Sequence, residues 1–257
     1  MLRFKYWLDS GLRRNDKVVI NQKIHKRETR PLYLSSCILY LHPMKQRNYS
    51  PVDQLVMNLD TGLRTLFGKP RTTERPNPAD DLPEADLDEA GRELAGRLMR
   101  INHAGEVAAQ GLYQGQALTA KLPEVREKMQ RAAEEENDHL DWCEQRIKET
   151  GSHVSYLNPL WYAGSVTIGA LAGLAGDKWS LGFVAETEHQ VVRHLDSHLQ
   201  QISETDQKTR AILEQMKQDE DRHATMALKA GGASLPGPIK TLMGLTSKIM
   251  TRTAWWI

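Results

Sequence analysis

Apolar residues recur at three- and four-residue steps along most of the chain beyond its first third. This spacing is the period of an α-helix that buries one face. It predicts four long amphipathic helices, over residues 88–120, 123–149, 180–203 and 205–230. No stretch of the sequence alternates apolar and polar residues over the length of a strand, so the pattern predicts an all-α protein.

Polar side chains interrupt the apolar stripe of the helix predicted over residues 123–149. Glu136 lies in the centre of that stripe, and His139, three residues later, faces the same way. Glu134 and Glu135 are expected to face water. A buried carboxylate without a counter-charge costs several kcal/mol, so this Glu-x-x-His pair indicates a bound cation. A single pair of this kind also fits a solvated helix face.

The same arrangement occurs a second time, which favours the metal over the solvated face. Glu220 and His223 form another Glu-x-x-His pair in the centre of the stripe over residues 205–230. Each pair follows a lone glutamate on an otherwise well-patterned helix, Glu106 before the first pair and Glu188 before the second. Glu188 fills a gap in its apolar stripe, whereas Glu106 lies at the border of its stripe. Two glutamates and two Glu-x-x-His pairs are the ligands that ferritin-like di-iron or di-manganese carboxylate proteins draw from four helices.

The charge of this ligand set predicts two metal ions. Four carboxylates balance the charge of two divalent cations, so the filled site is neutral and suits a core of low dielectric constant. Carboxylate and imidazole ligands without a thiolate favour iron or manganese over a structural zinc. We expect two iron ions.

The helix predicted over residues 180–203 carries other acidic and histidine residues besides Glu188, and their angle around the helix predicts that they are not ligands. Glu186 lies about 200° from Glu188 around the helix, so Glu186 and His189 are expected on the water side. His194 and His198 flank the apolar stripe, and the pattern favours polar surface histidines over ligands.

Composition limits the class of protein. The 257 residues carry 34 Lys and Arg against 33 Asp and Glu, and nothing in this balance points to nucleic acid. The two cysteines, Cys37 and Cys143, make a disulfide framework improbable and favour a reducing compartment.

The chain divides into three predicted parts. Residues 1–43 are a basic extension, which we interpret as dispensable or as a mis-assigned start, although a transit or signal segment stays open. Residues 44–87 hold a short amphipathic helix that begins near Ser50 and a proline-rich linker over residues 68–83. Residues 88–257 form the metal-binding domain.

Two stretches of that domain suggest contact with a lipid surface. Residues 154–176 carry no formal charge, but a span of the bilayer there would put Glu106 and Glu188 on opposite sides of the membrane. The alternatives are a buried crossover and a hydrophobic element in the membrane interface. The tail after Pro236 mixes apolar residues with Lys and Arg, contains no acid and ends in Trp255 and Trp256, so it fits either an anionic membrane surface or a cap on the bundle.

These residues resemble the demethoxyubiquinone hydroxylases of ubiquinone biosynthesis. The likeness covers the chain from Ala90 to Gly232, and residues 1–43 have no counterpart in it. It is carried by Arg100–Glu106, by Glu136–His139, by Asn158–Trp161, by Glu188 with His194 six residues later, and by Glu220–His223.

The resemblance implies a ferritin-like four-helix bundle with a hydrophobic crossover helix and a C-terminal amphipathic helix. It implies a di-iron monooxygenase that uses O2 to hydroxylate the ring of a polyprenyl demethoxyubiquinol. The protein would be attached peripherally to a membrane, in a bacterium to the cytoplasmic face of the inner membrane. His194 would orient a ligand, and Glu136 and Glu188 would bridge the metals. The implied iron ligands are Glu106, Glu136, His139, Glu188, Glu220 and His223.

Three other classes share part of the pattern. A ferritin-like iron-storage or iron-oxidising protein has no use for the uncharged segment and the basic tail. A rubrerythrin-like peroxidase usually needs more cysteines, and a membrane adaptor needs no buried carboxylates. The sequence leaves open the prenyl length, the electron donor, and whether the chain forms a homo-oligomer or joins other quinone-biosynthesis proteins. No glycine-rich dinucleotide motif is present, so we expect reducing equivalents from outside the chain or from the quinol itself.

Overall fold

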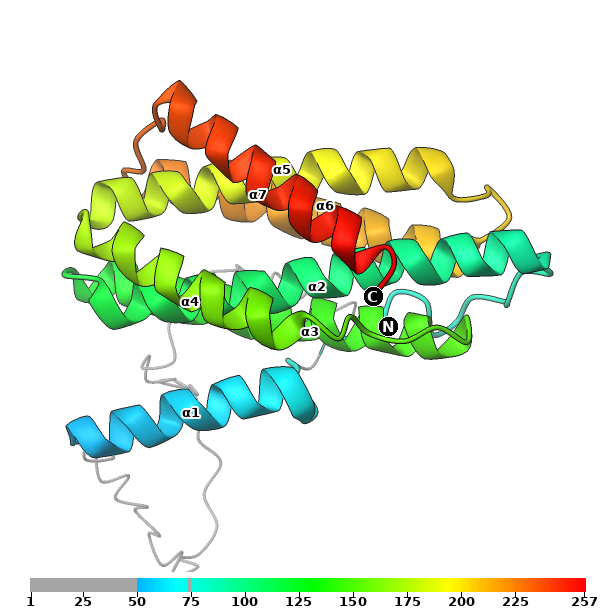
Figure 1. Cartoon of the computed structure of the whole chain (residues 1–257), viewed down its shortest axis with the longest axis horizontal. Helices are drawn as coiled ribbons and strands as arrows, with labels where there is room; N and C mark the ends of the chain where they lie inside the picture. The colour runs from blue at the N-terminus through cyan, green and yellow to red at the C-terminus, as the bar shows by residue number, and fades with distance from the viewer. Residues whose placement is uncertain (1–49, 74) are drawn as a thin grey trace, which may run out of the picture. The chain divides into compact units, whose positions relative to one another are not determined.

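The computed structural model describes residues 50–73 and 75–257, and the extension predicted over residues 1–43 lies outside this part of the chain. The described residues form seven α-helices and no strand (Figure 1). The helices are α1 (Pro51–Phe67), α2 (Glu89–Thr119), α3 (Pro123–Glu149), α4 (Asn158–Leu174), α5 (Asp177–Gln201), α6 (Gln207–Lys229) and α7 (Gly237–Ala254). The predicted all-α class is therefore confirmed.

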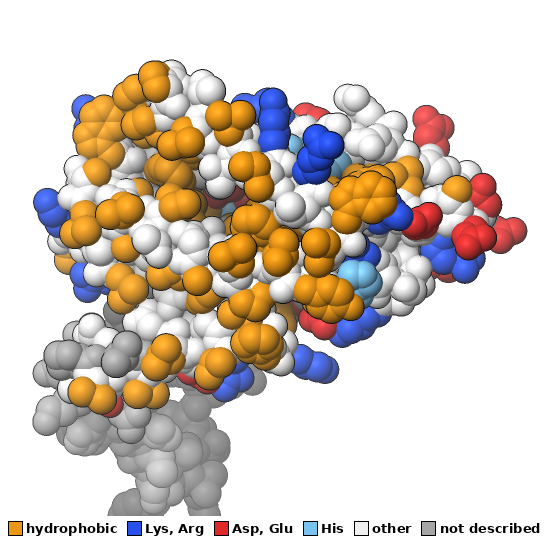
Figure 2. Space-filling view, in the orientation of Figure 1, with side chains coloured by type: hydrophobic (Ala, Val, Ile, Leu, Met, Phe, Trp, Pro, Cys, Tyr) orange, Lys and Arg blue, Asp and Glu red, His pale blue; other side chains and the backbone are white. Residues whose placement is uncertain are grey.

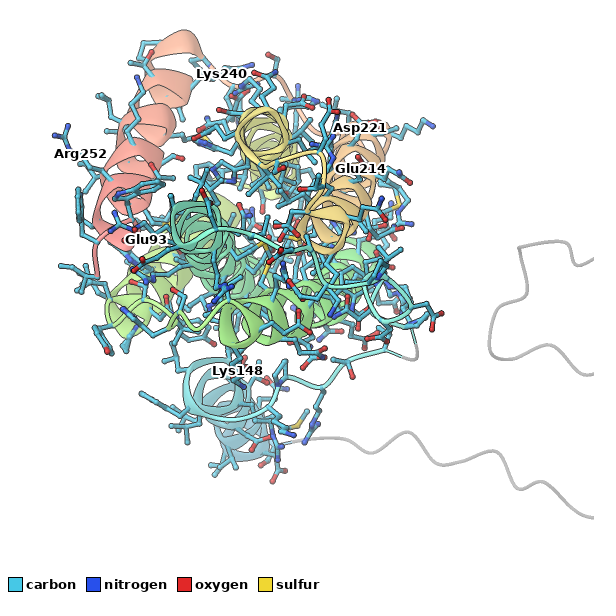
Figure 3. The ribbon with its side chains drawn as sticks, turned by 90° about the vertical axis from the view of Figure 1, so that its right-hand side faces the viewer. Glu93, Lys148, Glu214, Asp221, Lys240 and Arg252 are labelled. Atoms are coloured by element: carbon cyan, nitrogen blue, oxygen red, sulfur yellow. The ribbon has the colours of Figure 1, made fainter. Side chains whose placement is uncertain are left out.

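The four long helices predicted from periodicity are α2, α3, α5 and α6. Figure 3 looks along them and shows them grouped around a common core, with α4 and α7 on one side of the group. Helix α3 has the predicted bounds, while α5 begins at Asp177, three residues before the predicted start. The positive φ of Gly176, 111°, ends α4 and turns the chain directly into α5.

Two apolar clusters fill the bundle core, and a polar layer separates them. On α3, Ala132 belongs to one cluster and Trp142 to the other, and Glu136 and His139 lie between them. The same order holds on α2, α5 and α6. Apolar side chains therefore shield the polar layer from water at both ends of the bundle.

Helix α4 has two faces of different character. One face packs closely on α2, because a side-chain carbon at Gly169 would meet the backbone of Leu112 and Gln116. The other face is open, and Leu171 and Leu174 are 62% and 64% exposed. The uncharged segment is thus both a crossover packed on the bundle and a surface element. None of the helices in the described part of the chain has both the length and the hydropathy of a membrane span.

Helix α7 lies across the outside of the bundle (Figure 1). Its last residue, Ala254, is buried against α2 in a cluster with Ile101. Near its start, the Nζ atom of Lys240 lies 3.0 Å from Oε2 of Glu186. The prediction that Glu186 faces water is therefore wrong, because α7 covers that face of α5 and the phase of α5 alone cannot reveal a covering helix.

The connection between α1 and α2 is more than the linker predicted there. Residues 75–84, here called the strap, contain no helix but pack against the bundle. Ala79 is buried in a core cluster, and the carboxylate of Glu84 lies 2.7 Å from Nη1 of Arg146. The strap thus forms part of the wall of the bundle.

Candidate metal centre

The polar layer contains all six predicted ligands, and each of them is no more than 3% exposed. Helix α2 contributes one, α3 two, α5 one and α6 two. The residues are Glu106, Glu136, His139, Glu188, Glu220 and His223. Ligand atoms of Glu106, Glu136, His139 and Glu220 all lie within 4.8 Å of one another.

Each histidine directs its Nδ1 atom at several carboxylate oxygens. Nδ1 of His139 lies 2.9 Å from Glu136, 3.0 Å from Glu220 and 3.8 Å from Glu106. Nδ1 of His223 lies 3.1 Å from Glu220 and 3.2 Å from Glu136. One ring nitrogen carries at most one proton, and one oxygen of each shared glutamate has no hydrogen-bond partner. These atoms suit coordination of a cation better than hydrogen bonding to one another.

Glu188 lies beside this set and is held from α2. The hydroxyl of Tyr113 donates a hydrogen bond to Glu188 Oε1, and both side chains are buried. Burial and the negative charges of Glu220 and Glu136 raise the pKa of Glu188 well above its usual range. Burial and the charge of Glu188 likewise raise the pKa of Tyr113, so the phenol keeps its proton and remains a donor.

Burial and the crowding of carboxylates shift the pKa values of the other ligand residues. Burial, followed by the charge of Glu136, raises the pKa of Glu106 well above its usual range. Burial alone would lower the pKa of His139, but its hydrogen bonds to Asp219 and to the glutamates outweigh burial and raise that pKa. The pKa of His223 is raised for the same reason. A site that binds protons this strongly has the charge and the ligand types of a cation site.

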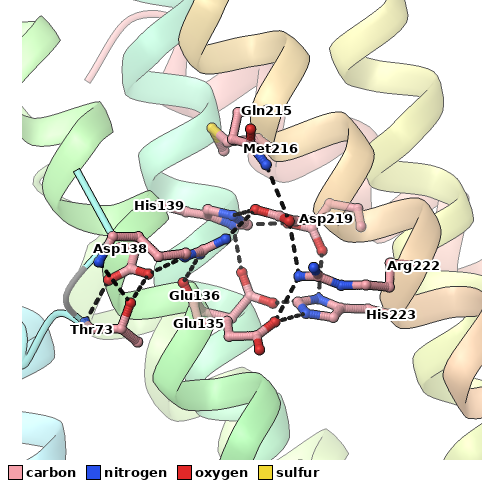
Figure 4. Close-up of polar contacts among 12 residues, drawn as sticks. Thr73, Glu135, Glu136, Asp138, His139, Gln215, Met216, Asp219, Arg222 and His223 are labelled. Atoms are coloured by element: carbon pink, nitrogen blue, oxygen red, sulfur yellow. Dashed lines mark hydrogen bonds and ion pairs between the residues drawn. The ribbon is translucent and has the colours of Figure 1, made fainter. Parts of the chain in front are cut away.

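The Nε2 atoms of the two ligand histidines each contact a carboxylate of the opposite helix (Figure 4). Nε2 of His139 on α3 lies 3.1 Å from Asp219 of α6, and Nε2 of His223 on α6 lies 2.8 Å from Glu135 of α3. Each acid immediately precedes the ligand glutamate of its own helix and serves the histidine of the other helix. Such partners fix the tautomer and the ring orientation of histidine ligands.

Sequence reasoning missed both of these carboxylates. Glu135, expected to face water, has a side chain only 13% exposed, because Arg222 and His223 of α6 close over it. Asp219 is 2% exposed. The available signal was the acid that stands directly before the Glu-x-x-His pair in both halves of the repeat.

His194 makes a contact with α7. Its Nε2 atom lies 3.0 Å from the hydroxyl of Ser247, and its role toward a ligand stays a prediction. Six residues after Glu188 correspond to about 600° of helical rotation, which turns His194 roughly 120° away from the metal ligands. His198, expected on the surface, is 5% exposed, and burial lowers its pKa to about 4.

Comparisons with known proteins agree on one family. A family model described as "Ubiquinone biosynthesis protein COQ7" matches residues 93–254. The chain is 64% identical over 214 residues to a 3-demethoxyubiquinol 3-hydroxylase of Nitrosococcus oceani, a match that covers 83% of this chain and 100% of that protein. It is 60% identical over 213 residues to the protein of the same name from Pseudomonas putida strain GB-1, covering 82% and 99% of the two chains. For strain W619 the identity is 58% over 213 residues, with the same coverage.

Proposed function

The chain belongs to the family of the ubiquinone biosynthesis protein COQ7, and on this premise we propose that it hydroxylates the ring of a polyprenyl 3-demethoxyubiquinol at a centre of two iron ions. The observation that carries the metal centre is the buried layer in which two imidazoles each face several carboxylates. Iron storage is not favoured as the alternative, because the relatives carry the name of a hydroxylase.

The donors suit this metal. The six ligand residues combine four carboxylates with two imidazoles, and no thiolate is among them. Two ferrous ions would neutralise the four carboxylates inside the apolar core. We assign Glu106, Glu136, His139, Glu188, Glu220 and His223 as the residues that would hold the two ions. Both histidines approach Glu136 and Glu220, which places these two carboxylates at the centre of the set.

When bound, a pair of ferrous ions supplies the redox chemistry toward O2 that ring hydroxylation requires. The chain itself orients the ligands and excludes water. His139 and His223 present Nδ1 to the centre because carboxylates of the opposite helix hold their Nε2 atoms. Tyr113 holds one oxygen of Glu188, which limits the rotation of that carboxylate. The two apolar clusters keep bulk water away from the reacting groups.

Cells that lack this chain test the function. They are expected to lose ubiquinone and to accumulate the intermediate that lacks one ring methoxy group. The wild-type chain should restore ubiquinone, Glu220→Gln should not, and Glu214→Gln should, because Glu214 lies on the same helix with its side chain 55% exposed. Normal ubiquinone in cells without the chain and without a second hydroxylase would overturn the assignment.

Metal analysis tests the centre separately. The purified protein should hold close to two irons per chain, with the spectroscopic signature of a coupled pair. One tightly bound zinc ion, or no metal, would rule out a di-iron centre even if the protein binds the quinol.

We also propose that the protein docks peripherally on a membrane, through the face formed by α4 and α7. Apolar side chains spread over this face in Figure 2. Leu171 and Leu174 of α4 and Leu242 and Ile249 of α7 are each at least 60% exposed. A patch of this kind on a surface that also carries basic residues suits an anionic lipid surface. In a bacterium like the named relatives, this surface would be the cytoplasmic face of the inner membrane, where a polyprenyl quinol resides.

Liposome flotation tests this docking face. Leu171→Glu with Leu174→Glu should reduce binding to phosphatidylglycerol-containing vesicles at least tenfold, because burial of two leucine side chains contributes about 2–4 kcal/mol. Met226→Glu with Leu228→Glu is the matched control, since these apolar residues are 45% and 44% exposed on α6. Equal binding of both variants would refute the docking face, and loss of metal from the first would place α4 in the core instead.

A further inference from the structure

Helices α3 and α6 differ in the residue that stands two positions after the ligand glutamate. The carboxylates of Glu135 and Asp219 hold the Nε2 atoms of the ligand histidines. On α6, Arg222 stands two residues after the ligand glutamate, and its Nη2 atom lies 2.8 Å from Asp219 and 2.9 Å from Glu135. On α3, the corresponding position is Asp138, which is fully buried and adds another negative charge. The α3 side therefore needs a cation from elsewhere in the chain.

The strap supplies that cation. Nε of Arg75 lies 2.7 Å from Asp138 Oδ2, and Nη1 of the same side chain lies 2.7 Å from Asp219 Oδ2. The guanidinium also lies over the ring of Trp142, 5.1 Å from its centroid. Thr73 donates to Asp138 from its backbone N–H and from its hydroxyl, both at 2.6 Å. One planar side chain thus joins α3 to α6 outside the ligand layer.

The hydrogen bond from Arg75 to α6 ends on the same carboxylate oxygen that contacts the ligand histidine His139. Oδ2 of Asp219 accepts from Nη1 of Arg75 at 2.7 Å and lies 3.1 Å from Nε2 of His139. Arg222 and Gln215 donate to the other oxygen of this carboxylate, Oδ1, at 2.8 and 3.3 Å. Arg75 therefore holds the oxygen that faces the imidazole, while the bundle holds the oxygen that faces away from it. The carboxylate of Glu135, which supports His223, has no such contact with Arg75 and is held by arginines of the bundle itself.

We propose that Arg75 is a positioning residue for the His139 half of the metal centre. By bridging Asp138 and Asp219 it fixes the Asp219 carboxylate against His139, so the strap holds one of the two metal positions. In the other half, Glu135 supports His223, and the Glu135 carboxylate is held by Arg131 of α3 and Arg222 of α6. Arg75 reaches only the backbone carbonyl oxygen of Glu135, at 3.4 Å. This inference rests on the proposed two-metal centre.

The test uses the full-length, metal-loaded protein and measures release of Fe²⁺ to an excess of a ferrous chelator. Arg75→Gln removes the charge and the paired hydrogen bonds. Arg75→Lys keeps the charge but cannot direct two bonds in the same plane. Arg71→Gln is the control, because Arg71 lies four residues earlier with a side chain 72% exposed and pairs with Asp60 on the surface.

Arg75→Gln should release one of the two ions about tenfold faster or more, since partners behind metal ligands typically contribute 10- to 100-fold to metal affinity. The second ion should leave at the wild-type rate. The release rate of the first ion from Arg75→Lys should fall between those of wild type and Arg75→Gln. Arg71→Gln should release both ions at the wild-type rates. With Mn²⁺ in place of Fe²⁺, electron paramagnetic resonance of Arg75→Gln should change from the signal of a coupled pair to that of an isolated ion as the first ion leaves.

A double substitution separates positioning from a general effect on folding. If Arg75 acts through Asp219, Arg75→Gln should add little to the release rate in an Asp219→Asn background. The inference is overturned if Arg75→Gln lowers only the unfolding temperature and leaves both release rates unchanged, or if its effect is undiminished beside Asp219→Asn. Should Arg75→Gln fail to fold, Arg75→Lys decides, and wild-type release rates in that variant overturn the inference. A wild-type protein that binds no metal would instead defeat the proposed function.

Discussion

The close packing of α4 on α2 offers a quantitative test, because the exposed leucines of α4 take their positions from it. An added side-chain carbon at Gly169 would lie 3.0 Å from the carbonyl carbon of Leu112 and 3.1 Å from the amide nitrogen of Gln116, with the carbonyl oxygen of Leu112 closer still. These are backbone atoms that cannot rotate away. Gly169→Ala therefore requires α4 to retreat by roughly 1 Å along a packed interface.

The expected cost follows from two opposing effects. Overpacking of a tight interface typically costs about 1–3 kcal/mol or more, while alanine in place of glycine favours a helix interior by about 1 kcal/mol. At Gly164 on the same helix nothing lies within 4 Å of an added carbon, so only the favourable effect applies there. The propensity gain is common to both variants, so Gly169→Ala should be less stable than Gly164→Ala by the overpacking cost of about 1–3 kcal/mol, or roughly 2–12 °C in Tm for a domain of this size.

Thermal unfolding followed by circular dichroism, on both purified variants in one buffer, measures this difference. Gly169→Ala should also bind vesicles less well than Gly164→Ala, because the retreat of α4 displaces Leu171 and Leu174. Equal melting temperatures would show that α4 does not pack on α2 through its glycines, and the assignment of its outer face to lipid would lose its structural basis.

Three further predictions concern charge in the core. Burial lowers the pKa of His103 from its ordinary 6.5 to about 4, so in acid the unfolded chain takes up a proton that the folded chain refuses. The resulting loss, about 2 kcal/mol of unfolding free energy from pH 7.5 to pH 5, should be absent in His103→Gln when denaturant curves are compared. Because the pKa values of the two ligand histidines are raised, metal binding should displace protons and weaken as pH falls. Calorimetry in buffers of different ionisation enthalpy measures this release, and no release would contradict the protonated site. Arg146→Met should cost about 3–5 kcal/mol, because it leaves buried Asp206 without its partner at 2.9 Å, and iron content should not change. A parallel loss of iron would show that the two regions are coupled.

Local periodicity was a reliable guide wherever the backbone and a single helix face decide the outcome. Helix α3 runs from Pro123 to Glu149 as predicted, because its hydrogen bonds are local and a proline favours its first turn. Glu136 and Glu220 could be singled out because a charged residue in the middle of an apolar stripe must be buried with its helix. Glu106 at the border of its stripe and His139 at the edge of its own are less clear from spacing, and for the full ligand set the resemblance added what the stripes did not show.

Contacts between distant segments were decided only by the tertiary structure. Arg75 reaches Asp219 across 144 residues of sequence, from a segment whose prolines predicted only a linker. The contact of His194 with Ser247 of α7 likewise joins segments far apart in sequence.

The amino-acid sequence alone determined the apolar stripe that each bundle helix turns to the core, because the stripe depends on spacing within one helix. It did not determine which outer faces other segments cover, as Glu186 and His198 show. The tertiary structure decided which carboxylate supports which histidine. It also decided that the strap joins α3 to α6 and which face of α4 stays open. These features depend on how helices pair in space, and the electrostatic and packing energies that select a partner act between side chains with no fixed separation in sequence.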